Sequence, residues 1–393
     1  MSGPEPAPAP PAGEARDTTE QNQGSTPRWA SVALAVVVAV TTVARAWIIA
    51  HYPEPDGDAK GHLGIARALL SDPFSVARHW VWPPGYHYLV AGLFAFGLPA
   101  QGVRYLNCGL AALLPFLVWR YGESLAPASP SRLARLAPLS AGLLCAAMPV
   151  VNLLGTSAEP GTVFAILALL CVWGVDRRRF GLAGVALAAA VMVRYEAAGA
   201  IGLLAGLRLV GCFPELARRV PAPLAEACRV PVRLIATPVL AVLAWLLAHR
   251  LSDGTWLGFV REILRYTHAQ RETYFHQDAW TDFFFFPVVQ PYYLFGLTIP
   301  LCLLGARRAW RTGFVVPLGI YLFLLVSYTF KGVLASGRYY ESLTPYLCIA
   351  AAHGAVVVGE RWRPATLLAY AAAFVHVVRL LLLLGRWTFH LAW

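Results

Sequence analysis

Long apolar runs separated by short polar segments dominate the 393-residue chain. Several runs reach the roughly 20 residues that an α-helix needs to cross the hydrocarbon core of a bilayer. We therefore expect an all-α polytopic membrane protein, with a transmembrane domain at 28–393 after a disordered cytoplasmic tail at 1–27. The pattern predicts about eleven spanning helices, at 29–50, 104–120, 134–154, 160–175, 180–193, 197–211, 233–250, 291–306, 313–330, 343–359 and 364–385.

Composition agrees with a membrane protein and argues against nucleic-acid binding. The chain is 58% hydrophobic and 13% charged, whereas a soluble domain carries roughly a quarter charged residues. The net charge of +11 comes from arginines in short clusters between apolar runs, which is typical of cytoplasmic loops. The seven cysteines form no CxxC motif, and most of them read as small buried hydrophobic residues.

The run at 83–99 decides the predicted topology. We expect it to lie along the outer interface, because its tryptophan, tyrosine and proline content suits that position. The arginine-rich loops then all face the cytoplasm, as the positive-inside rule requires. This arrangement predicts a multi-pass plasma-membrane protein with a cytoplasmic N-terminus and large outer loops at about 51–103 and 251–290.

Two aspartates, Asp56 and Asp58, follow the first predicted span. An aspartate at the membrane boundary is costly unless it lines a wet cavity or takes part in chemistry. Ionised at neutral pH, it can accept a proton from a hydroxyl or hold a metal. The alternative is that Asp58 caps a helix at 59–70, since aspartate is a favoured N-cap. We favour a catalytic role for Asp58, with Asp56 as the second candidate.

Other charged residues fall in the predicted outer turns. Glu159 precedes Pro160 and a span, so it is either a polar contact to substrate or a helix cap. Arg194 and Glu196 form either a structural salt bridge or a substrate contact. Lys331 and Arg338 can bind phosphate or extend to lipid headgroups.

The second outer loop, 251–290, is rich in aromatic residues. Its four-phenylalanine run, 283–286, suits contact with the membrane or with a lipid chain. Its histidines, His268 and His276, lack metal-ligand spacing, and we predict no metal site.

Together these motifs resemble the GT-C class of membrane glycosyltransferases, and most of all the members similar to glycosyltransferase family 39, such as protein O-mannosyltransferases and aminoarabinose transferases. That class has an acidic motif in the first outer loop, an arginine about nine residues later and an aromatic-Pro-Pro stretch. Here these elements look like Asp58, Arg67 and Trp82-Pro83-Pro84. A Ser-Glu pair and a late Arg-Tyr pair of the class are similar to Ser157 with Glu159, and to Arg338 with Tyr339.

The resemblance covers roughly 29–350 and has two departures. Many relatives carry Asp-Glu at the acidic motif, where this chain has Asp58-Ala59 with Asp56 upstream. We also expect no appended soluble outer domain.

The resemblance implies transfer of a sugar from a polyprenyl-phosphate donor to an acceptor hydroxyl at the outer face, with inversion and with Asp58 as general base. The acceptor would be a protein, a lipid or a glycan, and membrane lipids are the other partners. No cofactor is expected; a divalent metal is compatible with the two aspartates, but two nearby aspartates are thin evidence for one. The implied phosphate ligands are Arg338, Lys331 and Tyr339. The implied substrate contacts are Arg67, Trp82, His87, Glu159, Arg194 and Glu196.

Two other functions remain open on the sequence. A lipid or solute transporter or flippase would also need buried charges and an apolar groove, and Arg45 and Arg379, near span interiors, favour it most. A surface-glycan ligase or polymerase would use a lipid-linked oligosaccharide instead. The clustering of ionisable residues at one membrane boundary favours the enzyme over the transporter.

Overall fold

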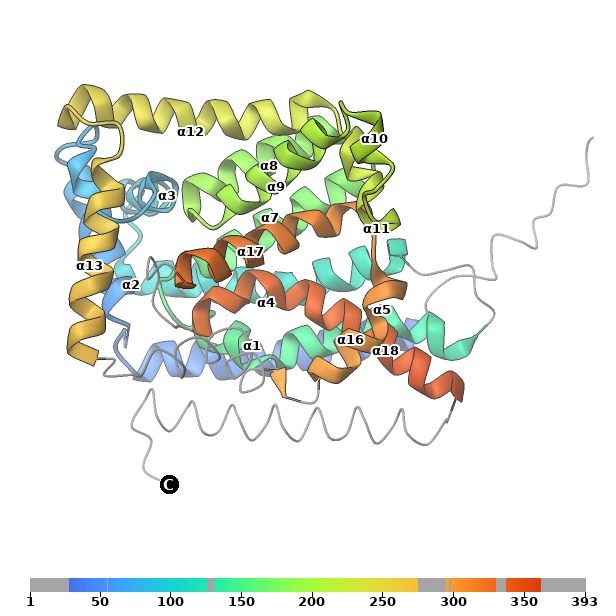
Figure 1. Ribbon diagram of the computed structural model, residues 1–393. Helices are drawn as coiled ribbons and strands as arrows, with labels where there is room; N and C mark the ends of the chain where they lie inside the picture. Colours follow the sequence, from blue (N-terminus) through green and yellow to red (C-terminus); the bar gives the residue numbers. More distant parts are fainter. Residues whose placement is uncertain are drawn as a thin grey trace, which may run out of the picture.

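The computed structural model is a bundle of α-helices that run back and forth in roughly parallel rows (Figure 1). It describes residues 28–54, 56–125, 131–274, 295–296, 298–329 and 337–361. Within these ranges the secondary structure is helical throughout, without strands. The long helices are α1 (Arg28–His51), α4 (Ala100–Leu125), α5 (Arg132–Ala147), α7 (Gly161–Asp176), α8 (Phe180–Val193), α9 (Ala197–Val210), α12 (Val232–Asp253), α16 (Thr298–Ala309), α17 (Val315–Thr329) and α18 (Thr344–Arg361).

The predicted all-α membrane architecture is confirmed, although the number of spans is not. Each predicted run up to 343–359 overlaps one of these helices, while 364–385 and the tail 1–27 lie outside the described residues. Among described residues, five helices are long and apolar enough to span a membrane, and four shorter apolar helices accompany them. The run 134–154 divides into α5 and α6 (Pro149–Leu154). A proline disfavours helical geometry in the residue before it, and Met148, which precedes Pro149, is extended.

Close glycine contacts hold the central helices together. α18 packs against α16 and α5, and Gly305 of α16 meets Gly354 of α18. A methyl group built on Gly305 would lie 1.9 Å from the carbonyl oxygen of Ala350. Small residues at such crossings allow two backbones to approach closely, which is the main source of helix association in lipid.

The outer helices expose apolar stripes. In α1 the exposed residues Val32, Val36, Val40 and Val43 recur at intervals of three and four, which places them on one helix face. α12 exposes a similar row at Leu240, Leu243, Leu247 and Leu251. α1 and α12 lie on opposite sides of the bundle (Figure 1). An apolar face turned outward suits contact with lipid.

The two ends of the bundle differ in chemistry. The short helices α2 (Gly57–Leu69), η2 (Ala77–His79) and α3 (Pro84–Ala95) lie at one end, and α13 (Gly258–Tyr274) runs across it (Figure 1). α10 (Pro214–Ala217) and α11 (Ala222–Ala225) lie at the other end. There Glu226 pairs with Arg178 at 3.4 Å and accepts a hydrogen bond from Thr312. Arg178, in the arginine cluster 177–179, therefore lies at the end of the bundle that carries α11.

Arg45, the residue that with Arg379 favours a transporter most, makes hydrogen bonds within the protein. Its side chain is buried in α1 and donates hydrogen bonds to Thr42 Oγ1 (3.0 Å) and Asn152 Oδ1 (3.4 Å). Asn152 lies on α6, so this contact ties α6 to α1. Arg379 lies outside the described residues.

The α16–α18 crossing generates a stability prediction. We expect Gly305→Ala to destabilise the protein by about 1–3 kcal/mol, because the added methyl group must displace backbone. Thermal unfolding in detergent measures the loss. Gly202→Ala on α9 is the matched control, since its Cβ meets nothing within 4 Å. Equal melting temperatures for both variants would contradict the packing described.

Candidate active site

The first predicted outer loop carries two of its carboxylates at the capped start of a helix, α2. Asp56 is the N-cap of α2, and its Oδ1 accepts hydrogen bonds from the backbone N–H groups of Asp58 (2.7 Å) and Ala59 (3.3 Å). The alternative that Asp58 caps the helix is therefore wrong, because α2 begins at Gly57 and its N-cap is Asp56. The cap leaves the Asp58 carboxylate free to face the interior of the site.

An ion pair and two hydrogen bonds of Glu54 connect this loop to α4 and to the turn before α7. Glu54 lies 3.5 Å from Arg104 and accepts hydrogen bonds from Ser157 Oγ (2.7 Å) and the N–H of Ala158 (2.8 Å). Asn107, one turn after Arg104 on α4, donates to the carbonyl oxygens of Ser157 and Glu159, both at 2.8 Å. These contacts fix Glu159 beside the start of α2.

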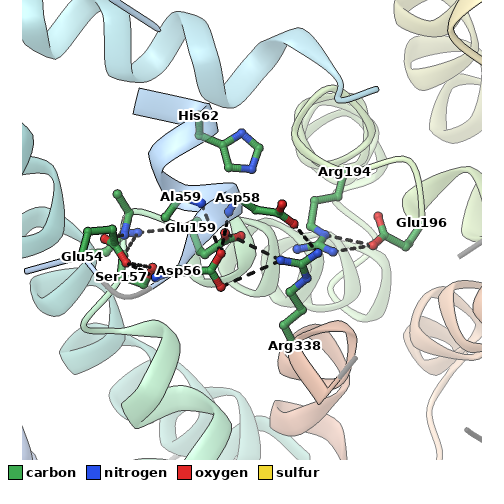
Figure 2. A network of polar contacts seen from close by, with 12 residues as sticks. Glu54, Asp56, Asp58, Ala59, His62, Ser157, Glu159, Arg194, Glu196 and Arg338 are labelled. Atoms are coloured by element: carbon green, nitrogen blue, oxygen red, sulfur yellow. Dashed lines mark hydrogen bonds and ion pairs between the residues drawn. The ribbon is translucent and has the colours of Figure 1, made fainter. Parts of the chain in front are cut away.

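Arg338, from the 3₁₀ helix η6 (Gly337–Leu343), brings three carboxylates together (Figure 2). Its guanidinium forms a close ion pair with Asp58 and lies 3.9 Å from oxygens of both Asp56 and Glu159. The Glu159 side chain does not cap α7, whose N-cap is Pro160 without a side-chain bond. The alternative role predicted for Glu159 is thus wrong, and its carboxyl group belongs to this cluster.

A second arginine lies beside the cluster (Figure 2). Arg194 donates from Nε and Nη2 to one oxygen of Glu196, at 2.9 and 2.8 Å. The guanidinium of Arg194 also stacks over the ring of Tyr339, 5.0 Å from its centroid, and that of Arg338 lies 5.8 Å from it. Two cations and one phenol therefore line the same wall.

This wall closes the polar end of a cavity of about 590 Å³. Asp58, Glu159, Arg194 and Arg338 contribute the charged groups. The rest of the lining is mostly apolar and comes from α8, α12, α13 and α17, including Val191, Val242, Leu246, Ile263, Phe323 and Val326. A ligand with a charged head and an apolar tail would match this division.

Burial sets the charge state of Glu159. Its side chain is 2% exposed, and burial raises the pKa of the carboxyl group to about 8, against the opposing effect of Arg338. Glu159 is therefore mostly protonated at neutral pH. Asp56, Asp58 and Glu159 each offer one oxygen, and these atoms lie within 4.8 Å of one another, so a divalent cation is chemically compatible with the cluster.

The other predicted site residues are not all in the cavity. Trp82 lines it, whereas Arg67 is exposed on α2 and packs over the ring of Phe94. His87 is buried outside the lining, against two other histidines. Lys331 lies outside the described residues, as do the four phenylalanines at 283–286.

Sequence reasoning missed several residues that build the site. Glu54 and Arg104 form its supporting ion pair. Glu341, fully buried in η6, accepts a 2.7 Å hydrogen bond from Thr162 on α7 and so positions Arg338 three residues earlier. Of these, only Glu54 carried a signal, as an acidic residue close to Asp56 in the first outer loop.

Comparisons with known proteins bear on the fold. No family model matches the chain, and no curated protein sequence matches it. The structure is similar to the crystal structure of ArnT from Cupriavidus metallidurans bound to undecaprenyl phosphate, with 16% identity and a TM-score of 0.56, over 87% of this chain and 63% of ArnT. The apo state of ArnT gives 16% identity and a TM-score of 0.51 over 86% and 62%.

A third similar structure is the archaeal oligosaccharyltransferase AglB from Archaeoglobus fulgidus, in complex with an inhibitory peptide and a dolichol-phosphate, with 11% identity and a TM-score of 0.44 over 91% and 55%. ArnT and AglB are both GT-C membrane glycosyltransferases. The GT-C fold that the motifs predicted is confirmed by the likeness to ArnT. This chain spans less than two thirds of the length of either protein.

The cap of α2 generates a prediction that separates structure from charge. We expect Asp56→Ala to destabilise the protein by about 1 kcal/mol more than Asp56→Asn, because asparagine retains the capping oxygen. Both variants remove the charge near Arg338, so their difference in thermal unfolding isolates the cap. Identical melting temperatures would show that the two hydrogen bonds contribute nothing.

The protonated Glu159 generates a pH prediction. The folded protein holds a proton on this group up to about pH 8, whereas the unfolded chain releases it near about pH 4.3. This contribution to stability is present below the lower value and disappears as the pH rises through the upper one.

We therefore expect Glu159→Gln to weaken the fall in melting temperature between pH 5 and pH 8.5, measured by thermal unfolding in detergent. Glu215→Gln, at an exposed carboxylate on α10, is the matched control. Parallel pH profiles for wild type and Glu159→Gln would contradict the assignment.

Proposed function

We propose that this chain is a membrane glycosyltransferase that moves a sugar from a polyprenyl-phosphate carrier to an acceptor hydroxyl on the outer face of the membrane. One observation carries the proposal. An arginine, paired with an aspartate and flanked by two more carboxyl groups, closes the polar end of an apolar cavity in a chain with the GT-C fold. The undecaprenyl phosphate named for ArnT supports the same class of donor here.

The apolar part of the cavity suits the lipid chain of the donor. Its lining comes from α12, α13 and α17, and a polyprenyl chain gains free energy by leaving water for such a surface. α13 crosses the end of the bundle (Figure 1) and contributes Ile263, Leu264 and Tyr266 to the lining. The polyprenyl chain of the donor would run from this cavity toward the surrounding lipid.

Arg338, Arg194 and Tyr339 are the proposed ligands of the donor phosphate. Guanidinium groups bind phosphate oxygens through paired, charge-assisted hydrogen bonds. Both arginines already have carboxylate partners, Asp58 and Glu196, so an arriving phosphate competes with those carboxylates. The predicted second cation, Lys331, remains a candidate for the same role.

Competition between the donor phosphate and Asp58 for Arg338 would make the Asp58 carboxylate available as a base. While Arg338 pairs with Asp58, the lone pairs of that carboxylate are engaged by the cation. A phosphate that draws the guanidinium toward itself releases Asp58 to accept a hydrogen bond from the acceptor hydroxyl. Binding of the donor would then activate the base.

The transfer step balances with these groups. The acceptor oxygen forms a bond to the anomeric carbon while the bond from that carbon to the phosphate oxygen breaks, and its electron pair leaves with the phosphate. The acceptor proton goes to Asp58. Attack opposite the leaving phosphate inverts the anomeric centre. General-base assistance typically contributes 10²–10⁴ in rate, and charge stabilisation at the phosphate adds to it.

Glu159 would act as a neutral donor beside the base. With its pKa at about 8, its carboxyl group carries a proton at neutral pH and can donate a hydrogen bond to a phosphate or sugar oxygen. A divalent cation held by Asp56, Asp58 and Glu159 would instead require Glu159 to release that proton. The proposed step requires no metal.

We expect Asp58→Asn to lower sugar transfer at least about 100-fold, because the amide keeps the size of the side chain and loses the base. The assay is transfer of radiolabelled sugar from polyprenyl-phosphate donors to a membrane extract by purified protein in detergent. Asp72→Asn is the matched control, since that carboxylate is exposed and pairs with Arg78.

The same assay separates the alternatives. Equal transfer by wild type and Asp58→Asn would keep the enzyme and remove Asp58 as base. No transfer by the wild type from any monosaccharide donor, but transfer from lipid-linked oligosaccharides, would identify a ligase or polymerase. No transfer from either class would contradict the proposal and favour a transporter.

A further inference from the structure

Three histidines form a hydrogen-bonded chain beside the cavity. His62 on α2 contacts His87 on α3 through Nδ1 and Nε2, 2.8 Å apart, and His87 contacts His79 on η2 through the two Nδ1 atoms, 2.9 Å apart. All three side chains are buried. Both ring nitrogens of His87 are therefore used within the chain.

One end of the histidine chain, His62, reaches the cavity. His62 lies four residues after Asp58 on α2, which places both on the same helix face (Figure 2). Both residues line the cavity. The ring of Trp82 packs against His62 with 4.5 Å between centroids. Because Nδ1 of His62 is bonded to His87, Nε2 is the atom left for a ligand.

The three histidines are electrically neutral at physiological pH. Burial lowers the pKa of His79 to about 4 and that of His87 to about 3, with a neighbouring histidine adding to each shift. Burial, with His87, Arg338 and Arg194, holds the pKa of His62 well below its usual value. Each ring therefore carries one N–H and one bare nitrogen.

The surroundings of His79, the histidine farthest from the cavity, decide which ring nitrogens carry the protons. Nε2 of His79 is buried and has no hydrogen-bond partner among the described residues. The neighbouring Trp245 offers no lone pair there, and its own N–H donates to Tyr195 Oη at 3.3 Å. An orphaned buried N–H is rarer than an unpaired acceptor, so this Nε2 is the bare nitrogen of His79.

The other positions follow in order. His79 then donates from Nδ1 to Nδ1 of His87, and His87 donates from Nε2 to Nδ1 of His62. The proton of His62 must consequently sit on Nε2, toward the cavity. The opposite order would leave a buried N–H of His79 without an acceptor.

We propose that His62 binds an oxygen atom of the donor substrate as a neutral hydrogen-bond donor from Nε2, and that His87 and His79 are positioning residues that fix this tautomer. The proposal rests on the function proposed above and extends it to a residue outside the charged cluster. A neutral donor adds a directed hydrogen bond without adding charge beside Asp58 and Arg338.

Nuclear magnetic resonance of the full-length protein labelled with ¹⁵N-histidine tests the tautomers directly. We expect protonated Nε2 in His62, protonated Nε2 in His87 and protonated Nδ1 in His79, with His62→Gln, His87→Gln and His79→Gln assigning the signals. The reverse set, or an imidazolium at His62 at neutral pH, would overturn the proposal.

Ligand binding tests the contact. We expect His62→Phe, which keeps an aromatic ring, to weaken binding of a sugar-carrying polyprenyl phosphate about tenfold, equivalent to one hydrogen bond of about 1.4 kcal/mol. His62→Gln, which can still donate, should recover most of the affinity. His51→Phe, an exposed histidine at the end of α1 outside this cavity, is the control.

Polyprenyl phosphate without sugar is the second ligand. Weaker binding of both ligands by His62→Phe places the contact on the phosphate, and weaker binding of the sugar-carrying ligand alone places it on the sugar. Unchanged binding of both by His62→Phe, with wild type binding normally, overturns this proposal alone. Failure of the wild type to bind either ligand would instead count against the proposed function.

Discussion

The ion pair between Arg338 and Asp58 is the interaction on which the site depends. Its two partners lie 280 residues apart in the chain and come from η6 and α2. A partly buried guanidinium needs carboxylates near it, because an uncompensated charge away from water is costly. Asp56 and Glu159 complete its surroundings at 3.9 Å. The bundle must therefore bring three distant loops to one end.

The supporting contacts show how the bundle does so. Glu54 and Arg104 join the first outer loop to α4 and to the turn before α7, and Glu341 joins η6 to α7 through Thr162. These residues make polar contacts with the protein, so their role is to hold the charged cluster in place. Both arginines are paired with carboxylates and lie over the ring of Tyr339, and the proposed function requires these ion pairs to exchange partners when an anion arrives.

The sequence predicts the architecture far better than the placement of single side chains. Apolar length identifies the helices, because lipid requires every backbone polar group to be paired within a helix. The first outer loop shows the limit. Asp58 looks like a cap when α2 is taken to start at 59, but the helix starts at Gly57 and Asp56 takes that role. A shift of two residues in the start of α2 changes which aspartate caps the helix and which one faces the site.

Arg67 shows a second limit. The resemblance matches Arg67 to a family arginine that lies about nine residues after the acidic motif. Nine residues are about two and a half turns of helix, so the side chains of Asp58 and Arg67 point to opposite faces of α2. Arg67 accordingly packs on Phe94, away from the cavity. His87 could not be placed from sequence either, because its partners His62 and His79 belong to other elements. Glu341 lies three residues after Arg338 in the sequence, but no spacing indicates its partner Thr162.

The exchange of partners at Arg338 is the central claim, and a structure with ligand tests it most directly. A cryo-electron microscopy structure in lipid nanodiscs with bound polyprenyl phosphate would locate the phosphate. The account predicts a phosphate contacting Arg338 and Arg194, with the Asp58 carboxylate released from its ion pair and facing the cavity. A phosphate bound elsewhere, with Arg338 still paired to Asp58, would contradict it.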